Sequence, residues 1–111
     1  MDNSLDRYKQ SIKEVLETYA TLSHEDLMVE LVFDDERLRY LALWVGWSDY
    51  RRIHHCAIHI EIIGDRIVIQ CNDTEEAIVT ELLKRGIPEE NVILGFIHPQ
   101  HQRGTTEESA A

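Results

Sequence analysis

Residues 52–71 read RIHHCAIHIEIIGDRIVIQC, and this stretch contains the strongest indication of the fold. Two runs of alternating, largely β-branched residues, 52–63 and 66–71, flank the dipeptide Gly64-Asp65. A dipeptide of this kind between two alternating runs is typical of a two-residue hairpin turn, in which glycine supplies the positive φ. The stretch therefore predicts an antiparallel β-hairpin.

Side chains alternate between the two faces of a strand, which sorts residues 52–63 into two sets. The set expected to face the core comprises His54, Cys56, Ile58, Ile60 and Ile62, and the other comprises His55, Ala57, His59 and Glu61. If the Gly64-Asp65 turn sets the register, Ile60 faces Ile69, Ile58 faces Cys71, and Cys56 lies diagonal to Cys71. Diagonal neighbours lie at or beyond disulfide reach, so we expect two reduced thiols in the core.

The residues before this hairpin predict a helix and two more strands. Apolar residues at steps of three and four over 4–20 indicate an amphipathic helix, with Asn3 or Ser4 as N-cap. MVELVF (28–33) and LRYLALWVGW (38–47) are strand-like, and SDYRR (48–52) is the expected turn after them. Apolar residues on both faces of 38–47 predict a strand that is covered on both sides.

The residues after the hairpin predict a second helix and a last strand. Helix 73–86 would be capped by Asp73 or Thr74 and stopped by Gly86, and VILGF (92–96) would form the strand. Strands segregated from helices favour an α+β fold with an antiparallel sheet of four to five strands. We expect one domain over 1–111, in which residues 98–111 form a C-terminal arm.

The charge, the apolar runs and the cysteine content of the chain argue against several classes of function. The chain has 111 residues, 11 Lys plus Arg against 21 Asp plus Glu, and a net charge of −10. Such a charge argues against direct nucleic-acid binding, which needs a basic surface. Apolar runs fall far short of the ~20 residues that span a bilayer, and the N-terminus MDNSLD shows no signal peptide. With only two cysteines, these features predict a cytoplasmic protein without a membrane partner.

The sequence contains few groups suited to catalysis or metal binding. Residue types that bind zinc occur in His54-His55-Cys56-x-x-His59 and again at His98 and His101. Because side chains alternate along a strand, only His55, His59 and Glu61 would share the exposed face and could form a surface site. A cysteine nucleophile needs an exposed thiolate, which a core Cys56 lacks. The acidic cluster 34–36 suits either a magnesium site or a polar turn. We therefore predict no catalytic residue, no metal and no cofactor.

An interaction surface is the better-supported expectation. Tryptophan, tyrosine and arginine are enriched at protein interfaces, and they gather around the predicted turn 48–52. Only one of two such close tryptophans is needed in the core, which leaves the other for a partner. The expected contact residues are Trp44, Trp47, Tyr50, Arg51 and Arg52. Long strands and two tryptophans also favour self-association, as a homodimer or a higher homo-oligomer.

Several stretches of the chain resemble the XisI-like family, named after the fdxN element excision controlling factor of filamentous cyanobacteria. They span nearly the full length, in family order: FDDERLRY (33–40), VGW (45–47), Arg52 to Ile60, RIVIQ (66–70), DTEEAIVTEL (73–82) and GIPEENVILGF (86–96). The chain departs from the family pattern at Gly64-Asp65, which reverses the usual Asp-Gly turn, and at Val68, where tryptophan is usual.

This resemblance implies a small α+β regulatory protein without catalytic residues of its own. It implies action with an XisH-like partner in the control of programmed DNA element excision, while a separate recombinase performs the recombination chemistry. Two alternatives stay open. One is a direct DNA-binding accessory factor for site-specific recombination, using Arg51, Arg52 and Arg103 on phosphates, and the other is a family member with an unrelated function.

Overall fold

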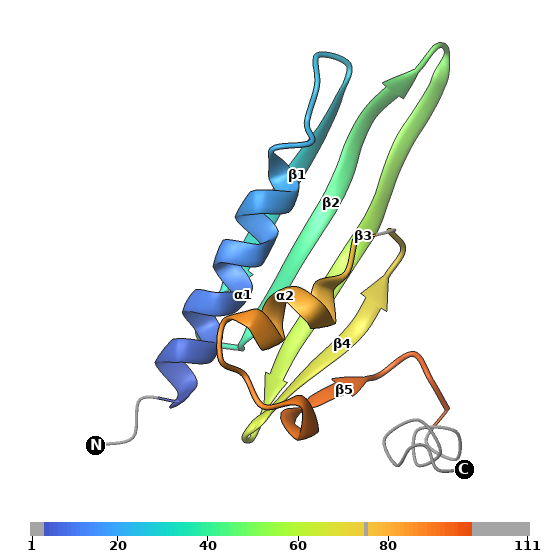
Figure 1. The fold of residues 1–111 in the computed structure, drawn as a ribbon. Coiled ribbons are helices and arrows are strands. Elements are labelled where there is room, and N and C mark those ends of the chain that lie inside the picture. The colour runs from blue at the N-terminus through green and yellow to red at the C-terminus, as the bar shows by residue number, and fades with distance from the viewer. Residues whose placement is uncertain (1–3, 75, 99–111) are drawn as a thin grey trace.

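The computed structural model describes residues 4–74 and 76–98. Helix α1 is followed by four strands, helix α2, a single 3₁₀ turn and a fifth strand, which together form the α+β fold predicted from the sequence (Figure 1). The sheet order is β1-β2-β3-β4-β5. The bounds are α1 Ser4–Ala20, β1 Leu27–Asp34, β2 Arg39–Ser48, β3 Arg51–Ile63, β4 Arg66–Asn72, α2 Ile78–Lys84, η1 Glu89–Asn91 and β5 Val92–Leu94.

The sheet has five strands and is mostly antiparallel, as predicted, with one parallel pair at its edge. β1 to β4 pair antiparallel, whereas β5 pairs parallel to β4. The chain leaves β4, passes through α2 and returns in the same direction, as a parallel connection requires. β5 therefore lies beside β4 at one edge of the sheet, and β1 forms the opposite edge.

Both helices pack on one face of the sheet, which we call the helix face (Figure 1). α1 buries the stripe predicted from its spacing, although Leu5 at its start is 42% exposed. Ile12 and Leu16 of α1 join Leu82 of α2 over the helix face, and all three side chains have no exposed surface. From the sheet, the core takes Tyr40, Ala42, Ile58, Ile60, Ile67 and Ile69.

Two β-bulges change the register expected for β3. Ile60 pairs with Ile69 as predicted, but Gln70 is an extra residue and Cys71 pairs with His59 instead of Ile58. On the other side of β3, Ala42 pairs with Ile58 and Leu43 with Cys56, so Ala57 is also an extra residue. Because an extra residue reverses the alternation beyond it, the predicted division of β3 into two faces is wrong from Ala57 back to Arg51, the start of the strand.

The second helix is shorter than the predicted span 73–86. Thr74 Oγ1 accepts a 3.0 Å hydrogen bond from the Glu76 backbone N–H, and Asn72 Nδ2 donates to the Glu76 carbonyl at 3.2 Å. These side-chain bonds hold the backbone in a local turn that competes with helix formation. α2 therefore begins only at Ile78, without a side-chain cap, so neither Asp73 nor Thr74 is its N-cap. Its end before Gly86, which has φ of 89°, agrees with the prediction.

Two predictions for the ends of the chain concern residues outside the described part of the structure. These are the N-cap candidate Asn3 and, apart from His98 itself, the C-terminal arm 98–111.

Candidate functional site

The hairpin between β2 and β3 extends past the strands on either side of it (Figure 1). Pairing with β1 ends at Gly46, and pairing with β4 ends at Ile58. Beyond these points β2 and β3 continue to pair with each other up to Ser48 and Arg51. The turn itself is Asp49-Tyr50, two residues within the predicted 48–52, and the flanking residues belong to the strands.

Four of the five predicted contact residues gather at this end of the hairpin, residues 47–52, which we call the hairpin tip. Tyr50 is 99% exposed and Trp47 is 51% exposed. The guanidinium carbon of Arg52 lies 5.4 Å from the centre of the Trp47 ring, in a cation–π contact. Arg51 is exposed on the other face of the hairpin, where it pairs with Ser48. The tip therefore presents two aromatic rings, two arginines and one aspartate, a net charge of +1 on a chain whose net charge is −10.

Trp44, the fifth predicted contact residue, lies on the helix face and away from the tip surface. Its Nε1 donates a 2.7 Å hydrogen bond to the hydroxyl of Tyr19, and the two rings meet edge to face with centroids 6.0 Å apart. The ring of His24 lies 6.3 Å away on the same side. Trp44 thus anchors the base of the hairpin to the last turn of α1, whereas Trp47 is exposed.

The opposite face of the sheet is bare among the described residues, which corrects the expectation that β2 is covered on both sides. Residues paired directly across strands share a face, so the register defines this open face. Its central apolar side chains are half-buried or exposed. They are Met28 and Val32 of β1, and Leu41, Leu43, Val45 and Trp47 of β2.

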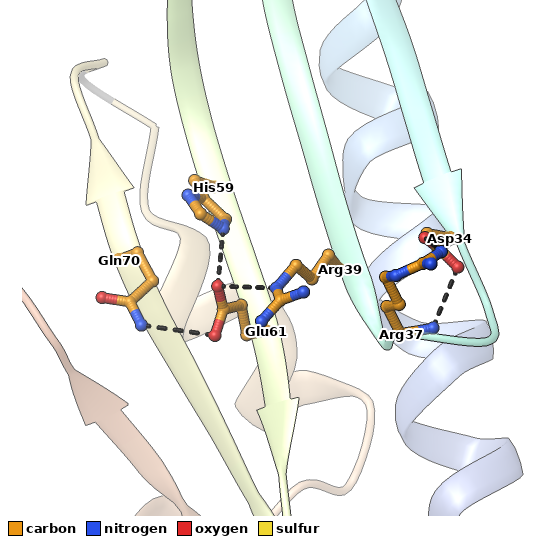
Figure 2. Close-up of polar contacts among 6 residues, drawn as sticks. All are labelled: Asp34, Arg37, Arg39, His59, Glu61 and Gln70. Atoms are coloured by element: carbon orange, nitrogen blue, oxygen red, sulfur yellow. Dashed lines mark hydrogen bonds and ion pairs between the residues drawn. The ribbon is translucent and has the colours of Figure 1, made fainter.

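A charged network lies within the open face (Figure 2). Glu61 receives a 3.1 Å hydrogen bond from Arg39 Nε, lies 3.0 Å from His59 Nε2, and receives a longer 3.5 Å bond from Gln70 Nε2. Its side chain is only 14% exposed. Burial acts to raise the pKa of Glu61, but the hydrogen bond and charge of Arg39, with His59 and Gln70, outweigh it and lower the pKa overall.

This network was not predicted from the sequence, because its members come from three strands whose pairing was unknown. His59 and Glu61 share one surface as predicted, but His55 lies on the helix face and Arg39 of β2 is a further partner of Glu61. The sequence does contain an arginine on one predicted strand and a glutamate on the next, which could form an ion pair. That they face each other can be recognised only once the β2–β3 register is known.

Comparison with known proteins gives the chain a family. It matches the family described as XisI protein over residues 1–109. A solved structure of a XisI-like protein from Anabaena variabilis ATCC 29413 superimposes with a TM-score of 0.82 at 35% identity, covering 89% of this chain and 93% of that one. The chain belongs to the XisI family. No curated protein matches it.

A second solved structure agrees with the first. It is titled fdxN element excision controlling factor XisI, from the same organism, with a TM-score of 0.78 and 34% identity over 90% of this chain and 93% of that one. The XisI fold therefore accommodates the reversed Gly64-Asp65 turn, which forms the predicted two-residue hairpin between Ile63 and Arg66. No helix in the described part of this XisI-family chain is long and apolar enough to cross a membrane.

His55 and His59, the two strand histidines considered for a surface zinc site, lie on different faces of the sheet. In this XisI-family chain the Ala57 bulge places His55 on the helix face opposite Trp44, while His59 and Glu61 lie on the open face. Within residues 4–74 and 76–98, no group of three or more histidine, cysteine or acidic side chains is arranged to hold a metal ion. His101 of the predicted set lies outside the described residues.

The two cysteines are free thiols, but they lie on the open face and are half-buried there, which corrects their predicted place in the core. Cys56 Sγ donates to the Ile58 carbonyl at 3.3 Å, and Cys71 Sγ lies 3.7 Å from the Cys56 carbonyl. Burial, together with the neighbouring Cys71, raises the pKa of the Cys56 thiol. This environment disfavours the thiolate that a nucleophile requires.

The acidic residues 34–36 form a polar turn between β1 and β2. Asp34 accepts hydrogen bonds from the backbone N–H groups of Glu36 and Arg37, and its carboxylate pairs with the Arg37 guanidinium at 3.3 Å (Figure 2). Asp35 accepts bonds from Lys13 at 2.7 Å and from the Tyr40 hydroxyl at 2.8 Å, which lower its pKa. Both carboxylates are thus engaged in holding the turn and α1 in place.

Proposed function

We propose that this XisI-family chain is a non-catalytic regulatory factor that acts with an XisH-like partner in the control of programmed DNA element excision. The observation that supports this most is the hairpin tip, where Tyr50 and Trp47 are exposed and Arg52 lies over the Trp47 ring. Exposed large aromatics next to arginine are the residue types that dominate binding energy at protein interfaces. The family, and a relative titled as an excision controlling factor, give the process.

Charge supports a protein partner that itself handles DNA. A protein that binds DNA must carry a basic surface, and a chain of net charge −10 is attracted to such a surface. Complementary charge mainly raises the association rate and fixes orientation. In this arrangement the negative charge of the chain speeds its association with the partner, and the aromatic residues of the tip stabilise the complex once it has formed.

The contacts of the titratable side chains support a role without catalysis. Glu61 and His59 are bound to each other, and Glu61 is also bound to Arg39. The Cys56 thiol is directed to a backbone carbonyl. These groups stabilise the sheet, and we propose that the chain regulates its partner through binding.

Co-expression with an XisH-like protein, tagged on that partner alone, tests the proposal. We expect the two chains to co-purify in a stable complex, and we expect Tyr50→Ala with Arg51→Ala to weaken it. Arg66→Ala is the control for loss of an arginine, because Arg66 is an exposed arginine at the start of β4, next to the turn at the far end of β3. Failure of two folded proteins to associate, or equal binding by the tip variant, would count against the proposal.

A second candidate function, direct contact with DNA, is favoured by one feature of the same tip. Arginine beside exposed aromatic rings is a pattern that binds nucleic acid by phosphate contact and base stacking. Arg51 and Arg52 would make the contacts, joined by Arg103, which lies outside the described residues. A mobility-shift assay of the chain alone, at roughly 0.15 M salt where exposed charges are partly screened, separates the two functions. Binding there would favour the second.

A further inference from the structure

We propose that the open face of the sheet is the interface between two copies of this chain. The face has a broad apolar centre that no described helix or strand covers. Met28 is 48% exposed, Val32 44% and Trp47 51%, and between them lie the half-buried Leu41, Leu43 and Val45. Contiguous apolar surface of this kind on a folded domain marks an interaction site. The open face shares Trp47 and Arg52 with the hairpin tip, whereas Tyr50 and Arg51 lie outside it, and the inference does not depend on the proposed partner.

The charges of the open face favour a second copy as its occupant. The register places six charged residues there, three acidic and three basic: Glu30, Asp34, Glu61, Arg39, Arg52 and Arg66. The face is therefore neutral overall, although the chain carries −10. Two such acidic chains repel each other over most of their surfaces. A neutral face of mixed sign is a surface through which they can meet.

Two of these charged residues, Glu61 and Arg52, already have partners within one chain, so covering them does not strand an ion. Glu61 is held by Arg39 and His59 at 3.1 and 3.0 Å and is only 14% exposed. Arg52 lies over the Trp47 ring. Burial of an unpaired charge is strongly unfavourable, whereas a charge that has its partners can be covered at lower cost.

The geometry suits two stacked sheets. Sheets pack face to face about 10 Å apart, with side chains from the two inner faces interdigitating. An arrangement of identical faces about a two-fold axis is the commonest form of soluble homo-oligomer. The helices of each copy then lie outermost, and the hairpin turns with Tyr50 stay outside the stacked centre.

Molar mass in solution, measured by light scattering over a dilution series of the full chain, tests the interface. We expect twice 13.0 kDa for the wild type and 13.0 kDa for the double variant Met28→Lys/Val32→Lys. Leu5→Lys/Leu22→Lys is the matched control, because these side chains are 42% and 49% exposed and lie off the sheet. Both variants lower the net negative charge equally, so loss of the dimer in the first alone reports the face.

Two results of that measurement would overturn the inference. They are a wild-type chain that stays at 13.0 kDa throughout, and a folded Met28→Lys/Val32→Lys variant that stays dimeric. Circular dichroism establishes that each variant is folded.

If the face variant does not fold, the wild type decides the matter by methyl NMR with a soluble paramagnetic agent. We expect the methyl groups of Val32, Leu41 and Val45 to be shielded more at high protein concentration than at low. Equal attenuation at every concentration would overturn the interface. Full shielding even in the dilute monomer would also overturn it, because residues of the same chain would then be the cover.

Discussion

The indole nitrogen of Trp44 donates a 2.7 Å hydrogen bond to the hydroxyl of Tyr19, and this bond ties β2 to the last turn of α1. Tyr19 is only 6% exposed, so its hydroxyl has little access to water. Removing it in Tyr19→Phe leaves the Trp44 N–H without this acceptor. We expect the free energy of unfolding to fall by about 1–2 kcal/mol.

Urea denaturation measures this change, and Tyr50→Phe is the control because Tyr50 is 99% exposed at the hairpin tip. Equal stability of Tyr19→Phe and the wild type would show that the bond between helix and sheet contributes nothing measurable.

Gly46 is the point where β2 passes close to the chain entering β1. A Cβ at this position would overlap the Asp26 carbonyl oxygen and lie 2.8 Å from the Leu27 Cα, both backbone atoms that cannot move aside easily. We expect Gly46→Ala to destabilise the fold by about 1–3 kcal/mol, as overpacking does. Thermal unfolding checks this, with the exposed Ser48→Ala on the same strand as control. Unchanged stability would mean that the approach is looser than the geometry indicates.

Glu61 should make the stability of the protein depend on pH in the acid range. Its pKa is lowered in the folded state below the ordinary value of 4.5, because Arg39 and His59 outweigh the effect of burial. A lowered carboxyl pKa contributes stability that is complete above 4.5 and is lost as pH falls through the folded value. We expect Glu61→Gln to lose this part of the acid dependence.

Urea midpoints measured over an acidic pH series test this effect. Glu30→Gln, at an exposed position of the same face, is the control and should keep the dependence of the wild type. An identical pH profile for the wild type and Glu61→Gln would contradict the assignment.

The thiols provide a test of the catalytic alternative. Because burial raises the pKa of Cys56 and its Sγ is directed to the Ile58 carbonyl, we expect slow alkylation at neutral pH. The rate with iodoacetamide should rise sharply when the chain is unfolded in urea. Alkylation of the native protein as fast as that of the unfolded chain would reopen the possibility of a cysteine nucleophile.

Much of the fold was predictable because local patterns and the final packing agree. The stripe over 4–20 forms α1, the alternating runs form β1 to β4, and Gly64-Asp65 forms the expected turn. The position of the tip residues also followed, since a two-residue turn at 49–50 lies inside the predicted 48–52. In each case the signal lies within a few neighbouring residues.

The errors arise where distant residues decide the outcome. The bulges at Ala57 and Gln70 depend on how three strands fit together, and they exchanged the expected environments of His55 and Cys56. The start of α2 at Ile78 depends on side-chain bonds that compete with the helix. The open face was not predicted, because apolar residues on both sides of β2 indicate that both sides are buried. They do not indicate whether the same chain or another chain covers them.

The extra residue at Ala57 has a consequence for comparing relatives. Every position from Cys56 to the turn owes its orientation to that single residue. In a relative that lacks this residue, the same amino acids at the tip would point to the opposite faces of the sheet. A sequence alignment that places the gap elsewhere in the strand would still score well, yet it would align exposed residues with core residues. Equivalent residues of the hairpin tip in relatives are therefore best identified by the residues they pair with across the strands, and not by their position in a sequence alignment.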